Sequence, residues 1–149
     1  MNAWDEFAAW AAALGAPLSP AQIAQFAAYE ALLLAWNERI ALTAIREPHQ
    51  IRIRHFLDAL SCAAATGPLD GQRLIDIGSG AGFPGLPLKI LYPDLRLTLV
   101  DSVAKKARFL ETVAAELGLS DVIVIADRAE ALGQAAGHRE SYDWAAARA

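Results

Sequence analysis

The sequence predicts an α/β fold in which N-terminal helices precede a parallel sheet. In the first part of the chain, apolar residues recur at helical spacing. From residue 73 onward, short runs of Leu, Ile and Val alternate with helical segments, and a glycine-rich turn follows the first run. Strands that alternate with helices are joined by right-handed crossovers, which give a parallel sheet covered on both faces.

Residues 1–70 are expected to form a helical extension that packs on a core of residues 71–149 as one structural unit. The first helix has Trp4 to Leu14 at helical spacing, and Gly15 ends it. A capping box from Ser19 to Gln22, with proline at the first helical position, opens a second helix that runs to about residue 36. Three tryptophans are expected to anchor the helical part: Trp4, Trp10 and Trp36.

A third helix is expected to begin at Pro48. Its inner side would carry four apolar residues: Ile53, Phe56, Leu57 and Leu60. The glycine- and proline-containing segment 67–71 then breaks the pattern and is typical of a connector.

The core is predicted to contain strands at residues 73–77, 97–100, 122–125 and 142–147, with helices at 84–92 and 130–136. Between the second and third strands, Ser102 is expected to cap a helix that Gly118 ends. The sequence ends directly after the fourth strand, so we expect the C-terminal strands of the sheet to be missing. We also expect the remainder of the protein, or a partner, to cover that edge.

The turn after the first strand indicates a nucleotide-type pocket. Gly78 and Gly80 would let the backbone approach a ligand closely, and free amide groups at the start of the next helix would face that ligand. A dinucleotide-binding turn needs a third glycine at position 83, but Phe83 stands there and the glycine comes one residue early, at Gly82. Asp76, just before the turn, is unfavourable beside a pyrophosphate and favourable beside a cation. Both features favour S-adenosylmethionine over NAD.

Asp101 lies at the end of the second strand. A carboxylate at this place accepts hydrogen bonds from both ribose hydroxyls of an adenosyl group. A helix cap or a solvated strand end is the alternative interpretation of Asp101, and a plain tight turn that of the glycines. Together, in this order and spacing, the two features predict an adenosyl pocket.

Bulk properties narrow the class of protein. The 149 residues are 55% hydrophobic with a net charge of −4, so the chain has no overall positive field to attract nucleic acid, although local basic patches remain open. A single cysteine, Cys62, excludes an internal disulfide. The N-terminus lacks the basic region of a signal peptide, and the apolar runs are too short to cross a membrane. A cytoplasmic monomer without a membrane anchor is expected.

Several separated segments resemble one family, the small-subunit ribosomal RNA methyltransferase G family, also called glucose-inhibited division protein B. They are residues 37–46, 54–60, 74–87, 101–102, 105–110, 127–130, 142–143 and 148–149. The resemblance implies a Rossmann-like class I methyltransferase sheet and S-adenosylmethionine-dependent methylation of N7 of a guanosine in bacterial 16S rRNA, as free rRNA or in the small ribosomal subunit. It also implies cofactor contacts at Gly78, Phe83, Ala129, Glu130 and Arg148, with Phe83 covering the cofactor. Ala41 departs from the family, which usually has asparagine there.

The implied chemistry needs no general base. Guanine N7 is a lone-pair nucleophile that loses no proton, so catalysis would come from positioning, and we expect no catalytic side chain and no metal. Two other functions stay open. One is a nucleotide- or RNA-binding module without turnover; the other is an NAD-dependent oxidoreductase, which Asp76 and the early glycine oppose.

Two basic groups are candidates for phosphate contacts, with a solvated helix face as the alternative for each. The first lies near the third helix and contains Arg46, His49, Arg52, Arg54 and His55. The second follows Asp101 and contains Lys105, Lys106 and Arg108. His55 and Asp58 are expected to form a structural pair at helical spacing.

Overall fold

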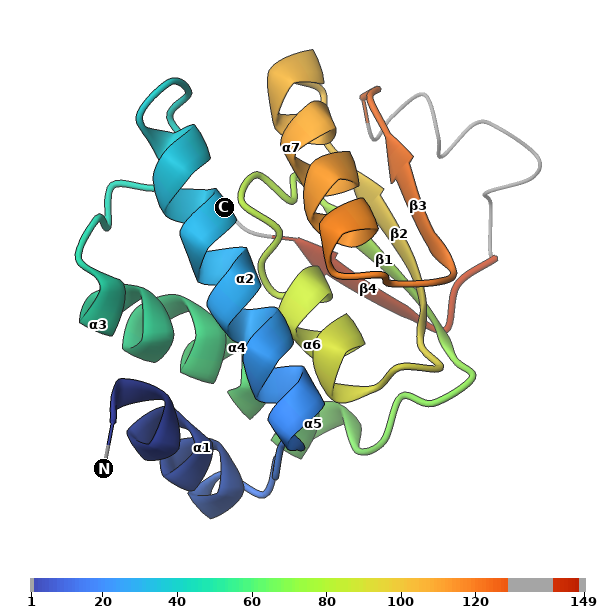
Figure 1. Cartoon of the computed structure of the whole chain (residues 1–149). Helices are drawn as coiled ribbons and strands as arrows, with labels where there is room; N and C mark the ends of the chain where they lie inside the picture. The colour runs from blue at the N-terminus through green and yellow to red at the C-terminus, as the bar shows by residue number, and fades with distance from the viewer. Residues whose placement is uncertain (1, 129–140, 148–149) are drawn as a thin grey trace.

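A computed structural model describes residues 2–128 and 141–147 of the chain. Its centre is a parallel four-stranded sheet in the order β3-β2-β1-β4 (Figure 1). The strands are β1 (Arg73–Ile77), β2 (Arg96–Val100), β3 (Val122–Ile125) and β4 (Trp144–Ala147). The predicted α/β fold and its four strands are therefore confirmed.

The fourth strand begins two residues later than predicted. The N–H of Arg73 donates to a carboxylate oxygen of Asp143 at 2.8 Å, instead of to a backbone carbonyl. The regular ladder between β1 and β4 therefore begins at the next pair, Leu74 with Trp144.

The first two helices match the prediction. Helix α1 (Ala3–Ala13) is capped by Asn2, and α2 (Pro20–Asn37) by Ser19 through the predicted capping box. Helix α2 packs along α6 (Gly85–Leu91) and α7 (Ala104–Glu116). In the described residues, α6 and α7 cover one face of the sheet (Figure 1). Cover of the other face stays a prediction.

The predicted third helix contains a π-helical turn. It runs through α3 (Pro48–Ile51), the π-helix η1 (Arg52–Leu57) and α4 (Asp58–Ser61), and α5 (Ala63–Thr66) follows. A π-turn holds more residues than an α-turn, so it rotates the residues that follow relative to the predicted phase. Ile53, predicted to face inward, is therefore 37% exposed, while Phe56 and Leu60 are buried as predicted.

The start of α7 also differs from the prediction. No side chain caps this helix, so the prediction that Ser102 is its cap is wrong. The carboxylate of Asp101 instead accepts a hydrogen bond from the N–H of Val103, because its side chain turns back into the loop. The predicted helix at 130–136 lies outside the described residues.

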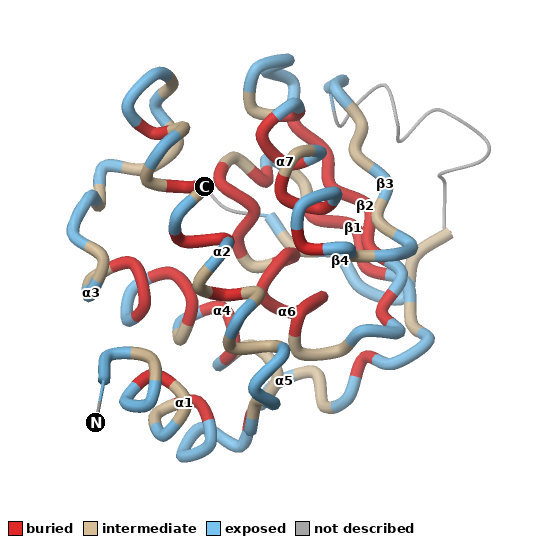
Figure 2. The backbone as a smooth tube through the Cα atoms, viewed as in Figure 1, coloured by how far each residue is buried: buried red, intermediate tan, exposed pale blue. Residues whose placement is uncertain are grey.

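One apolar cluster joins the helical extension to the sheet. The rings of Phe7, Phe26, Tyr29 and Phe56 pack against one another, and Tyr29 and Phe56 also contact Phe83 of the glycine loop. The apolar cluster continues into β1, β2 and α7. Figure 2 shows buried backbone running from the helical layer into the strands. Of the predicted anchors, Trp4 and Trp36 pack half-buried on this cluster, and Trp10 contacts His49. No helix in the described part of the chain is long and apolar enough to cross a membrane.

Candidate functional site

A cavity of about 460 Å³ lies at the carboxyl edge of the sheet. Its lining comes from the ends of three neighbouring strands: Ile77 and Gly78 after β1, Val100, Asp101 and Ser102 after β2, and Asp127 and Arg128 after β3. Ligands of parallel α/β sheets bind at this edge, and the volume lies in the range of small-molecule pockets. The cavity is therefore the candidate site.

The glycine loop is tied to the end of β2. The N–H groups of Gly78 and Ser79 both donate to the carbonyl of Val100, at 2.8 and 3.1 Å. Gly78 has φ +70°, and an added Cβ would meet no atom within 4 Å. Glycine at position 78 therefore allows the left-handed backbone conformation. It also leaves open space in which a ligand can approach the main chain.

Asp101 joins the two loops that border the cavity. Its Oδ2 accepts from the N–H of Gly80 and its Oδ1 from the N–H of Val103, both at 2.9 Å. Each carboxylate oxygen accepts about two hydrogen bonds, so each retains capacity for a ligand hydroxyl. Asp101 thus holds the glycine loop in place and remains part of the cavity lining.

Asp76 lies beneath the site instead of in it. It is 0% exposed, and its Oδ2 accepts a hydrogen bond of 2.9 Å from the N–H of Gly85, the first residue of α6. The next amide, of Leu86, donates to the carbonyl of Gly82, and Pro87 has no N–H. The prediction that free amides at the start of this helix face a ligand is therefore wrong, because the protein itself occupies them.

Gly85 allows the helix to pack closely against the sheet, which is the role of the third glycine in a dinucleotide-binding turn. An added Cβ at Gly85 would lie 2.8 Å from Asp76 Oδ2 and 2.9 Å from a methyl carbon of Leu99. The close approach of helix and sheet thus occurs at residue 85, two positions after the predicted one. Helix α6 begins at Gly85, one residue after the predicted start at residue 84.

The side chain of Phe83 points into the helical layer. It is 3% exposed and stacks on the imidazole of His55, with ring centres 4.3 Å apart and planes 12° apart. Its ring therefore does not cover the cavity, in contrast to the prediction. The neighbouring loop residue Ala81 accepts a hydrogen bond of 2.5 Å from the hydroxyl of Tyr29. The helical extension thus supports the glycine loop from behind.

The structure brings together three of the predicted site residues: Gly78, Gly80 and Asp101. Ala129, Glu130 and Arg148 lie outside the described residues. The prediction missed five other lining residues as site residues, namely Ile77, Val100, Ser102, Asp127 and Arg128. The rule that ligands meet the carboxyl ends of parallel strands would have identified them, since all lie within three residues of such an end.

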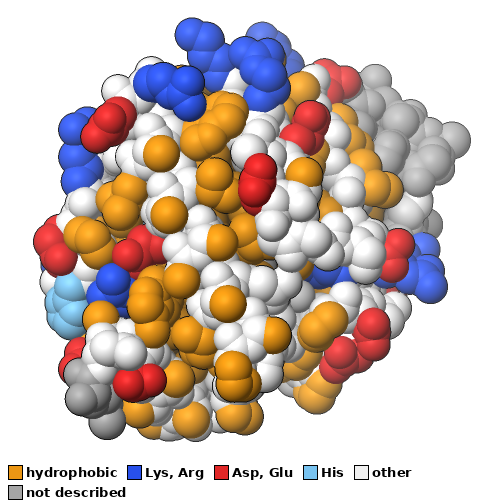
Figure 3. Space-filling model, viewed as in Figure 1, with side chains coloured by type: hydrophobic (Ala, Val, Ile, Leu, Met, Phe, Trp, Pro, Cys, Tyr) orange, Lys and Arg blue, Asp and Glu red, His pale blue; other side chains and the backbone are white. Residues whose placement is uncertain are grey.

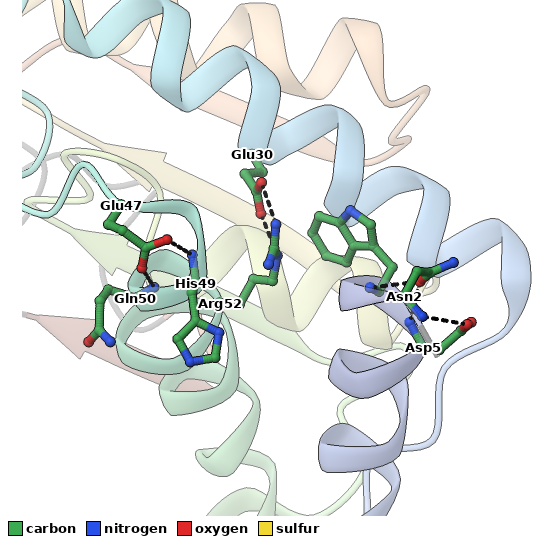
Figure 4. A network of polar contacts seen from close by, with 8 residues as sticks. Asn2, Asp5, Glu30, Glu47, His49, Gln50 and Arg52 are labelled. Atoms are coloured by element: carbon green, nitrogen blue, oxygen red, sulfur yellow. Dashed lines mark hydrogen bonds and ion pairs between the residues drawn. The ribbon is translucent and has the colours of Figure 1, made fainter.

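Two members of the first predicted basic group, Arg52 and His55, lie in the π-turn and are buried. Both are only 9% exposed. Arg52 makes a two-point ion pair with Glu30 at 2.9 Å, seen in Figure 4. His55 Nε2 hydrogen bonds with Thr43 Oγ1 at 2.8 Å. These two residues are therefore structural, and the prediction that they contact phosphates is wrong; the His55–Asp58 pair stays a prediction.

The other polar contacts near Arg52 are helix caps. Figure 4 shows Glu47 accepting from the backbone of His49 and Gln50 at the start of α3, and Asn2 with Asp5 at the start of α1. Two backbone hydrogen bonds lower the pKa of the Glu47 carboxyl. Burial raises the pKa of the Glu30 carboxyl, although Arg52 opposes that rise.

Fold and cavity define an α/β protein with a candidate small-molecule site at the carboxyl edge of a parallel sheet, the edge at which such sheets bind nucleotides and cofactors. Residues 22–149 match the family model of rRNA small subunit methyltransferase G (GidB). The chain belongs to this family, as its sequence motifs predict.

Curated relatives carry the same name. The chain is similar to ribosomal RNA small subunit methyltransferase G of Roseiflexus castenholzii, with 54% identity over 97% of this chain and 62% of that protein. The protein of that name in Alkaliphilus metalliredigens is 48% identical over 91% of this chain and 57% of its own length. The chain thus spans about three-fifths of the length of these relatives.

One solved structure is also similar. It is the C-terminal domain of precorrin-6Y C5,15-methyltransferase from Rhodobacter capsulatus, at a TM-score of 0.46 and 22% identity over 52% of this chain and 42% of that chain.

Proposed function

We propose that the chain binds S-adenosylmethionine in the cavity at the carboxyl edge of β1, β2 and β3. We further propose that the protein methylates N7 of a guanosine in bacterial 16S rRNA. The observation that carries the proposal is Asp101 beside Gly78 in a cavity of cofactor size, in a chain of the methyltransferase G family. Ribosomal RNA is found in the cytoplasm, so we place the activity there.

Each proposed cofactor contact has a physical reason. The Asp101 carboxylate keeps lone pairs for the ribose hydroxyls, and the bare backbone at Gly78 leaves room for the amino acid part of the ligand. Gly80 belongs to the site through its hydrogen bond to Asp101. For Ala129, Glu130 and Arg148, the sequence resemblance supports a role in cofactor binding.

The residues of this chain would act by positioning. Bound S-adenosylmethionine supplies a methyl group activated by a positive sulfur. Guanine N7 needs no proton removed, so no side chain has to serve as general base. The loop residues have to fix the orientation of the cofactor, and the cavity walls have to exclude water, which is catalysis by alignment.

The geometry disfavours a dinucleotide. A pyrophosphate would need amides at the start of α6, but Asp76 already accepts the hydrogen bond from the amide of Gly85 there. The remaining alternative is a cofactor- or RNA-binding module without turnover.

We also propose that residues 1–70 and 71–149 act together as one monomeric unit. The shared apolar cluster and the contact of Tyr29 with Ala81 support this, because the extension then supports the loop that borders the cavity.

Calorimetric titration tests the cofactor assignment. Wild-type protein should bind S-adenosylmethionine and not NAD. Asp101→Ala should lower that affinity by roughly tenfold to a hundredfold, because hydrogen bonds to a charged group contribute about 1.5–3 kcal/mol. Asp70→Ala, an exposed carboxylate far from the cavity lining, is the matched control and should bind normally. Binding of NAD alone would refute the proposal.

Methyl transfer then separates an enzyme from a binding module. Transfer from labelled S-adenosylmethionine to small ribosomal subunits and to free 16S rRNA is measured with this chain and with a full-length relative. Labelled N7-methylguanosine with both proteins supports an enzyme. Cofactor binding without transfer by this chain supports the binding module.

A further inference from the structure

A second hollow lies between the end of α2 and the first turns of α7. It has a volume of about 310 Å³ and five lining residues: Trp36, Arg39, Ile40, Lys105 and Arg108. Figure 3 shows Lys and Arg side chains gathered at the top of the molecule, where these two helix ends lie in Figure 1. We call this hollow the basic groove. Three of its five lining residues are cationic and none is acidic.

The cations of the groove form no salt bridge within the described residues. Within the described ranges, the salt bridges join Arg52 to Glu30 and Arg73 to Asp143, and none involves a groove residue. Arg39, Lys105 and Arg108 are all exposed. Their charges are therefore available to an external anion, and they form a local positive field on a chain whose net charge is −4.

The floor of the groove is a fixed aromatic surface. The Trp36 ring packs edge-on against Phe109, with ring centres 5.6 Å apart, which anchors it to the core. The guanidinium of Arg39 lies over the same ring at 5.2 Å. An indole held this way orients the arginine and, with Ile40, offers an apolar surface next to the cations. Such a combination suits a sugar–phosphate chain better than a free inorganic anion.

The position of Lys105 and Lys106 adds a physical argument. Both lie in the first turn of α7, which has no acidic residue. The helix dipole favours acids there and disfavours cations. These lysines therefore do not stabilise the helix, and a role outside the folded chain explains them better than a solvated helix face does.

The groove is next to the candidate site. Ser102 lines the cavity, and Lys105 follows three residues later in the chain. An RNA strand held in the groove would thus run toward the carboxyl edge of the sheet.

We propose that the basic groove binds the phosphate backbone of the RNA substrate without reading its sequence, and so delivers a neighbouring nucleotide to the cavity. This rests on the proposed function, because the cavity has to be the methylation site for delivery to matter. Phosphate contacts of this kind position a nucleic acid and carry no sequence information.

The test compares two variants of the chain. One neutralises the groove: Arg39→Gln, Lys105→Gln and Arg108→Gln. The control neutralises two exposed arginines that belong to neither predicted basic group: Arg73→Gln and Arg96→Gln. Arg73 and Arg96 are paired at the amino edge of the sheet, opposite to the cavity. The ligands are unmodified 16S rRNA transcript and small ribosomal subunits, titrated at several salt concentrations, with thermal unfolding as a check on folding.

The groove variant should bind RNA roughly tenfold or more weakly than the control near 100 mM salt. Its slope of log affinity against log salt concentration should be shallower by about 2. The variant loses three cations, and each phosphate contact contributes about 0.7 to 0.9 to the slope. Equal affinities and slopes for the groove variant and the control would overturn the proposal. So would wild-type protein that binds neither the transcript nor the subunits.

Calorimetry with S-adenosylmethionine keeps the two proposals apart. No groove residue lines the cavity, so the groove variant should bind the cofactor like the wild type. A wild-type chain that binds RNA through the groove but binds no S-adenosylmethionine would refute the proposed function and leave RNA binding by the groove intact.

Discussion

Arg52→Met should be among the most damaging single substitutions in the helical extension. It leaves the Glu30 carboxylate buried without its cation, and it removes the guanidinium that lies 4.6 Å from the centre of the Trp4 ring. Breaking a buried ion pair costs about 3–5 kcal/mol. About a tenth of each side chain stays exposed, so we expect the lower end, about 3 kcal/mol. For a domain of this size, that corresponds to about 6–12 °C in Tm.

Urea unfolding at pH 7 and thermal melting measure this loss. Arg73→Met is the control, because its partner Asp143 lies at 3.8 Å and both side chains are almost half exposed. Its cost should stay below about 1 kcal/mol. The double variant Glu30→Gln/Arg52→Met should recover most of the loss, since no buried charge remains. Equal losses for the two single variants would refute the reasoning.

The loss of stability in the Arg52→Met variant should depend on pH. Burial raises the pKa of Glu30 above 4.5, and without Arg52 it should rise further. The folded state then holds a proton that the unfolded state releases. Glu30 thus contributes stability that is present below pH 4.5 and is lost as the pH rises through the folded pKa. The deficit of Arg52→Met should therefore shrink between pH 7 and pH 5; a constant deficit would show that Glu30 is not its cause.

Three further substitutions probe buried contacts: two of them support the glycine loop, and the third holds the segment after α2. Tyr29→Phe leaves the Ala81 carbonyl without its donor, so we expect about 1–2 kcal/mol lower stability in urea and weaker cofactor binding by calorimetry. Gly82→Ala places a methyl group 2.5 Å from the Tyr29 hydroxyl at φ +100°, and its melting temperature should fall more than that of Tyr29→Phe. Asn37→Ala removes three hydrogen bonds to the 42–43 backbone, and hydrogen exchange there should accelerate at least tenfold. Unchanged exchange would contradict the last expectation.

The fold was predictable because its signals are local. Caps such as Ser19, stops such as Gly15 and Gly118, and apolar runs of strand length each act within a few residues of sequence. The π-turn at Arg52 was not predictable in this way. Its residues form helical patterns at the ordinary period, and the tertiary contacts of Arg52 with Glu30 and of His55 with Phe83 accompany the altered phase.

The site was predictable in its chemistry and less so in its orientation. Gly78 and Asp101 border the cavity because strand ends determine their place. Asp76 and Phe83 belong to the same glycine-rich motif, yet their side chains point into the protein interior. Sequence spacing assigns a residue to a loop; which side of the backbone its side chain occupies depends on packing against α6 and the helical extension.

The hydrogen bond between Asp76 and the first amide of α6 has a consequence for selectivity among cellular nucleotides. The carboxyl group of Asp76 is a permanent part of the chain, so the phosphates of a nucleotide would have to compete with it for the amide of Gly85. A nucleoside without phosphates faces no such competition. Under the proposed function, Asp76 would disfavour phosphate-bearing nucleotides at the start of α6 although it lies outside the cavity lining.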